Sequence, residues 1–340
     1  MYKLNPNCTI VDRDDMYIIA NTKSGKYYQI NKTQFDYLQR CIGEETINNP
    51  KDIESPKERA FIMQLIQIEF LVNTDHHTHH RKRFEYTDLL HFRIAILNPD
   101  RFCTGLLKCI KLIWRWYFLL PAAILLIASL WETILVWSSG QFVSQKYSIV
   151  QLLLLIYSTT LILSPGHELA HAVLCKAYGG TVQDMGIAFI NLNPCFYCNI
   201  SASYLFKKKK QRIMVVLVGI LYDIVVVAIS IVVLFNFFKL SKNLLKDYIY
   251  FSILMLLFEL NPLIKHDGYY VLTEITSVYN LREKAFESVR IIFENPKQII
   301  KAIKVNLLYI IYGVISVLYT AFHLTVLIKS LISILLLVFP

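Results

Sequence analysis

Residues 149–171 read IVQLLLLIYSTTLILSPGHELAH, an apolar run that passes directly into two histidines separated by three residues. The run is close to the length of about 20 residues that a helix needs to cross a bilayer. On a helix, His167 and His171 share one face about one turn apart, so both imidazoles can hold one Zn²⁺. Glu168, between them, can reach a metal-bound water. The stretch therefore predicts a membrane helix that carries part of a metal site.

The alternative is a chance match, because a five-residue pattern with three fixed positions also arises by accident. Ionisable side chains at bilayer depth are costly, however, and are seldom kept there without a role. The setting of the motif therefore favours a zinc metalloprotease that works within a membrane over a chance match.

The composition of the whole chain also indicates a membrane protein. Of its 340 residues, 55% are hydrophobic, and the mean hydropathy of +0.44 exceeds that of ordinary globular proteins. Several apolar segments approach the length of a membrane span. They cover 116–137, 148–171, 213–238, 248–264 and 305–328, and a shorter run covers 331–339. We expect a polytopic α-helical protein of the cell membrane with five spans, the short run being an uncertain sixth.

The distribution of cationic residues predicts the orientation of these spans. Only Lys146 lies after the first span, whereas 207–212 after the second and 282–304 after the fourth are rich in lysine and arginine. This alternation places the N-terminus in the cytosol, although Lys239, Lys242 and Lys246 in an expected outer loop weaken the case. The net charge of +10 then reflects topology and anionic lipid. A nucleic-acid partner is not expected, since no basic stripe interleaves with aromatics on a soluble face.

Ahead of the membrane segments, residues 1–75 are expected to form a small soluble α+β domain. The stretches 16–21 and 27–30 are β-prone and flank a hairpin turn, and 33–41 and 58–68 carry apolar residues at helical spacing. Residues 76–112 are a linker that approaches the bilayer, and 113–340 form the membrane domain. Within the linker, the tract from His76 to His80 is interpreted as a solvated connector, with metal binding as the alternative.

The second span and the motif helix together are too long to cross a bilayer straight, so we expect a bend. Ser164, Pro165 and Gly166 directly precede His167, and proline with glycine is a usual cause of a kink. Gly179 and Gly180 are expected to end the helix. The β-prone stretch 181–204 then follows at the cytosolic face.

A catalytic zinc needs a third protein ligand. Asp267 is the candidate, because the fourth span descends to the same leaflet as the motif helix and ends in NPLIKHDG, residues 261–268. Asp267 has an alternative interpretation as a helix-ending Asp-Gly turn. His266 is the competing ligand, but adjacent residues on a helix diverge by about 100°, which favours an outer or gating position for it.

Other polar residues in or near the spans remain open. Asp223 and Glu259 either line the cavity or are partnered structural carboxylates. Asn193 and Asn261 each precede a proline, so each either presents its amide to the substrate backbone or only ends a helix. Together with His266, these two asparagines are the candidate substrate contacts.

The combination of His-Glu-x-x-His in one span and Asn-Pro followed by Asp-Gly in a later one resembles the site-2 protease family of intramembrane zinc metalloproteases, over residues 113–330. The resemblance is greatest to a bacterial branch of peptide zinc metalloproteases. It implies zinc ligation by His167, His171 and Asp267, with Glu168 as the catalytic base. Ile220 is a departure, since the matching span usually reads Gly-Pro after residue 218.

The segment 23–31, with the helix from Thr33, resembles the PqqD-like module, a small winged-helix fold that grips leader peptides. That resemblance implies capture of an extended peptide on a strand edge. These resemblances therefore imply an intramembrane zinc endopeptidase that cleaves a peptide or membrane-associated precursor during maturation or export of a bacteriocin-like peptide. A peptide exporter is an expected partner. The rivals are proteolysis of a membrane signalling protein and a non-catalytic immunity or export component that only binds peptide.

Overall fold

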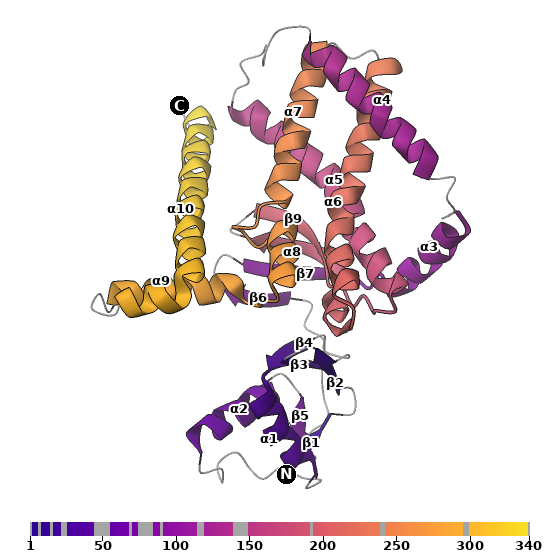
Figure 1. Cartoon of the computed structure of the whole chain (residues 1–340). Helices are drawn as coiled ribbons and strands as arrows, with labels where there is room; N and C mark the ends of the chain where they lie inside the picture. Colours follow the sequence, from indigo (N-terminus) through magenta and orange to yellow (C-terminus); the bar gives the residue numbers. More distant parts are fainter. Residues whose placement is uncertain are drawn as a thin grey trace. The chain divides into compact units, whose positions relative to one another are not determined.

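The computed structural model describes residues 2–5, 8–13, 16–21, 26–43, 55–67, 70–73, 84–88, 91–113, 119–138, 149–190, 193–238, 242–294 and 299–338 (Figure 1). The chain divides into two compact units. The first contains residues 1–110 and 171–215, and the second contains 111–170 and 216–340. The tract from His76 to His80 lies outside the described residues.

The N-terminal part of the first unit is a small mixed structure. Strands β2 (Cys8–Arg13), β3 (Met16–Asn21) and β4 (Lys26–Ile30) form an antiparallel sheet, while β1 (Tyr2–Leu4) pairs with β5 (Leu71–Asn73). The helices are α1 (Lys32–Gly43) and α2 (Pro56–Gln67). The two predicted strands and the two predicted helices are confirmed.

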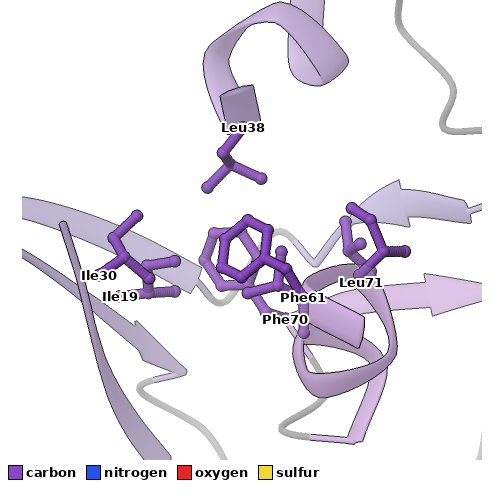
Figure 2. Packing of buried hydrophobic residues seen from close by; sticks show 8 residues of the cluster. Ile19, Ile30, Leu38, Phe61, Phe70 and Leu71 are labelled. Atoms are coloured by element: carbon purple, nitrogen blue, oxygen red, sulfur yellow. The ribbon is translucent and has the colours of Figure 1, made fainter. Parts of the chain in front are cut away.

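Local chemistry and packing explain this part. Asn31 and Gln34 exchange hydrogen bonds between their side chains and backbone N–H groups at 2.8 and 3.0 Å, which forms a capping box at the start of α1. Figure 2 shows the core, where apolar side chains of the sheet meet those of both helices. Its buried members are Ile19, Ile30, Leu38, Phe61, Ile62, Leu65, Phe70 and Leu71.

A second sheet joins distant parts of the sequence. Its antiparallel order is β6 (Phe84–Asp88), β7 (His91–Leu97), β8 (Met185–Ile190) and β9 (Asn193–Cys198). The expected extended stretch 181–204 is confirmed as β8 and β9, followed by a 3-10 helix, η3 (Ser201–Leu205). The strands over 84–88 and 91–97 were not expected, because the sequence indicated only a linker that approaches the bilayer over 76–112. The same stretch also contains the amphipathic helix α3 (Asp100–Ile113).

The remaining helices are long and mostly apolar. They are α4 (Leu119–Trp137), α5 (Ile149–Ala177), α6 (Lys209–Asn236), α7 (Lys242–Glu259), α8 (Asp267–Thr276), α9 (Leu281–Glu294) and α10 (Ile299–Val338). Among the described residues, three segments are long and apolar enough to cross a membrane, 120–137, 209–236 and 307–325. These three helices are consistent with a membrane protein. Of the other two expected spans, 148–171 falls in α5, and 248–264 begins in α7 and continues past its end.

One expectation about the last apolar run changes in the structure. The short run 331–339 is not a separate helix, because α10 continues through it to Val338. Pro165 lies inside α5, which is one helix from Ile149 to Ala177, and the expected bend there stays a prediction.

Within the second unit, α4, α6 and α7 share a core of buried Val136, Val227, Ile231, Leu245 and Ile249. The same region holds the buried carboxylate of Glu132, whose Oε1 accepts from the side-chain amide of the exposed Asn236 at 2.5 Å. Large apolar side chains on α4, α6 and α10 are exposed instead, including Ile127, Leu221 and Leu308. Exposed apolar side chains along helices of this length suit contact with lipid.

Candidate metal centre

The histidines of the motif lie in the C-terminal half of α5, and both are buried, with 7% of His167 and 3% of His171 exposed. The helix ends as the sequence predicts. Gly179 has a φ of +90°, and the N–H groups of Gly179 and Gly180 bond to the carbonyls of Lys176 and Cys175. This is the glycine-terminated end that leaves a helix without strain.

Each histidine is held through its Nδ1 atom. His167 Nδ1 lies 2.7 Å from Oδ2 of Asp223 on α6, and His171 Nδ1 lies 2.6 Å from the carbonyl oxygen of Val215. Both partner oxygens accept a hydrogen bond, so each imidazole is held in the tautomer whose Nδ1–H is the donor. The Nε2 atoms are then the nitrogens available to a metal ion.

Asp267 completes the group. The side-chain ligand atoms of His167, His171 and Asp267 lie within 4.8 Å of one another, and His167 Nε2 is 3.2 Å from Asp267 Oδ2. Two ligands of a tetrahedral zinc, each at about 2.0–2.1 Å from the ion, are about 3.4 Å apart. Two imidazole nitrogens and one carboxylate oxygen also match the donor set of catalytic zinc sites. The residues therefore form a group that can bind a metal ion.

Asp267 does not lie where the helix-ending interpretation placed it. The helix α7 ends at Glu259, and Asp267 is the first residue of α8. Between the two helices, Asn261 Oδ1 accepts the N–H of Leu263 at 2.9 Å, which stabilises a local turn. The backbone passes so close to Gly268 that a Cβ there would overlap the carbonyl oxygen of Leu260. A tight loop therefore presents the carboxylate of Asp267 to His167.

The candidate base, Glu168, follows His167 on α5 and is half-buried. Successive helical residues are rotated by about 100°, so Glu168 does not share the face of the two histidines. Glu168 does not belong to the ligand group found among the described residues, as expected of the glutamate in a His-Glu-x-x-His site, which acts on the metal-bound water and is not a ligand.

The proposed substrate contacts have mixed outcomes. His266 is not part of the ligand group found among the described residues. Its Nδ1 is 3.2 Å from Glu259 Oε2, and its ring centroid is 4.7 Å from that of Phe258. Asn261 serves the turn described above, and Asn193 begins β9 but its side chain lies outside the described residues. Their contact with substrate stays a prediction.

One feature that sequence reasoning missed fixes the end of the motif helix. Asp100, the first residue of α3, accepts from Lys176 Nζ at 2.6 Å and from the N–H of Val182 at 2.9 Å. Burial alone would raise the pKa of Asp100, but the bonds from Lys176 and Val182 and the charge of Lys176 outweigh it and lower that pKa. The carboxylate thus joins α3, the last turn of α5 and the segment that leads to β8.

No family model, curated protein or solved structure matches this chain. The functional argument therefore depends on the motifs, the ligand group and the fold around it.

Proposed function

We propose that the protein is an intramembrane zinc endopeptidase of the site-2 protease type. The observation that carries this proposal is the group of His167, His171 and Asp267, with Glu168 one residue along the same helix as the histidines. The apolar helices α4, α6 and α10 support a setting within a membrane. Two imidazoles and one carboxylate leave the fourth position of a tetrahedral ion for water, as a catalytic zinc requires.

In this proposal, bound zinc supplies a Lewis acid and lowers the pKa of its water towards about 7. Glu168 takes the proton of the attacking water as the water oxygen bonds to the scissile carbonyl carbon. Glu168 then delivers that proton to the leaving nitrogen as the C–N bond breaks. The products are a carboxylic acid and an amine, which ionise to a carboxylate and an ammonium group, so atoms and charge balance.

The proposed substrate is a peptide or membrane-associated precursor, because a peptide must be extended before its carbonyl groups become accessible. Strand β9 is the last strand of its four-stranded sheet, and an extended peptide is proposed to add to the sheet beside it. Asn193, Asn261 and His266 are proposed contacts. The sheet of β2, β3 and β4 has edges of its own, and a PqqD-like role there would raise the effective concentration of a leader-bearing peptide. Maturation or export of a bacteriocin-like peptide is the process that fits both features.

The substitution Glu168→Gln tests the catalytic part of the proposal. Glutamine keeps the size of the side chain but cannot accept the proton, so we expect zinc content to be unchanged and cleavage to fall by about 10²–10⁴-fold. The measurement is zinc per chain together with cleavage of membrane-bound model peptides. Full cleavage by the variant would refute the role of Glu168. Absence of cleavage by the wild type across a broad peptide screen would favour a protein that binds peptide without cutting it.

A further inference from the structure

The buried carboxylate of Asp223 interrupts an otherwise apolar segment of α6. It lies between Tyr222 and Ile224 within the candidate span 209–236, and 8% of the residue is exposed. A carboxylate in a membrane helix is costly and is retained where it faces a partner inside the protein. The sequence left open whether Asp223 lines a cavity or is a structural acid, and the contacts in the second unit decide this.

The contacts place the ring of His167 between two carboxylates. Asp223 Oδ2 is 2.7 Å from its Nδ1, and Asp267 Oδ2 is 3.2 Å from its Nε2. The side chains of His167 and Asp223 are 8% and 12% exposed, so water competes little for this hydrogen bond. The two carboxylates use opposite ring nitrogens, so both contacts are compatible with a metal ion on the Nε2 side.

The close packing of α5 and α6 fixes this contact. Gly166 directly precedes His167, and a Cβ at Gly166 would overlap the side chain of Tyr222, which directly precedes Asp223. The missing side chain of Gly166 therefore lets the two helices approach at the level of the histidine.

We infer that Asp223 is a positioning residue of the metal centre. By accepting the hydrogen bond from Nδ1–H of His167, Asp223 fixes the tautomer and the ring orientation that direct Nε2 at the ion. Its negative charge also raises the basicity of the imidazole as a metal ligand. His171 differs, since its Nδ1 partner is the main-chain carbonyl of Val215. The centre thus combines one histidine backed by a carboxylate with one backed by a neutral carbonyl. This inference rests on the proposed function.

The test compares full-length wild type with Asp223→Asn and Asp223→Ala in detergent. Asparagine keeps an acceptor for the Nδ1–H but removes the charge, whereas alanine removes both. Zinc affinity, measured by chelator competition, should fall by about 10–100-fold in Asp223→Ala, with Asp223→Asn between it and the wild type. The absorption spectrum of the cobalt-loaded protein should also change, because it reports the geometry of the ligands.

The matched control is Glu132→Gln. Glu132 is another buried carboxylate in an apolar helix, and its Oε1 accepts from Asn236 on α6. Neither residue belongs to the ligand group found among the described residues. This variant should bind zinc and cobalt like the wild type. Unchanged zinc affinity and cobalt spectra in both Asp223 variants would overturn the inference. An equal loss of affinity in Glu132→Gln would also overturn it, because the effect would then be one of general stability. A wild type that binds no zinc would instead refute the proposed function.

Discussion

At the scale of the residue, the position of Asp267 depends on its neighbour Gly268. Asp267 is the first residue of α8, and the loop from Leu260 to His266 folds back against the start of that helix. There is no room for a Cβ at Gly268, since the backbone of Leu260 and Asn261 occupies that space. A backbone carbonyl cannot move aside as a flexible side chain can, so the loop must shift.

We predict that Gly268→Ala lowers zinc affinity and costs about 1–3 kcal/mol of stability, because the added methyl group forces the loop and the carboxylate apart. Chelator competition and thermal unfolding in detergent measure the two effects. Gly105→Ala is the control, since nothing lies within 4 Å of a Cβ there, and alanine within α3 should be neutral or stabilising. Zinc affinity equal to that of the wild type in Gly268→Ala would show that the loop does not position Asp267.

The candidate site illustrates which contacts local sequence can predict. The spacing of His167 and His171 determines their common face, because both lie on one regular helix. The contact of Asp223 with His167 depends on how α5 packs against α6, which no local pattern encodes. The sequence showed that Asp223 is an acidic residue within an apolar segment, but it did not indicate that its partner is His167.

At the scale of the element, the carboxylate of Asp100 holds the C-terminal end of α5. Its bonds to Lys176 and to the N–H of Val182 stabilise the charged form, so the pKa of Asp100 is lower in the folded protein than its ordinary value of 3.8. This contribution to stability is complete above the ordinary pKa and is lost as the pH falls through the lowered folded value. Because the carboxylate is partly exposed, solvent limits the contribution to about 1 kcal/mol.

We therefore predict that Asp100→Asn is less stable than the wild type at pH 6, and that the difference shrinks towards pH 2–3. Melting temperatures measured over this range provide the comparison. Lys265 with Glu283 is a more exposed pair, and Glu283→Gln serves as a control that should change stability less. A difference between Asp100→Asn and the wild type that does not depend on pH would contradict this account.

The strands β6 and β7 show why the linker was misread. Phe84, Tyr86, Phe92, Ile94 and Ile96 recur at every second residue on either side of a short break. That period is typical of strands. Besides β6, however, β7 pairs with β8, whose residues lie about 90 positions later along the chain. Without the partner strand, the apolar content was interpreted as contact with lipid.

At the scale of the whole molecule, hydropathy can indicate candidate membrane helices because lipid imposes length and composition on each segment separately. The three segments that qualify among the described residues fall within or overlap three of the five expected ones. The hydropathy of separate segments does not predict the organisation into two units. The first unit combines residues 1–110 with 171–215, so α5 begins in one unit and ends in the other.

We predict that the N-terminus and the exposed lysines 207–210 at the start of α6 face the cytosol, while residues 239–241 after α6 face outward. A protease-sensitive tag placed at each of these three positions tests the orientation. In spheroplasts, only the tag at 239–241 should be cleaved before permeabilisation. Cleavage of the N-terminal tag in intact spheroplasts would reverse the topology.

The most direct test of the central claim is the zinc content of the purified protein beside His167→Ala, Asp267→Ala and His266→Ala. We predict about one zinc per chain in the wild type and in His266→Ala, and loss of zinc in the other two variants, because His167 and Asp267 belong to the ligand group and His266 does not. A wild type without metal, or zinc retained without Asp267, would contradict the proposed metal centre.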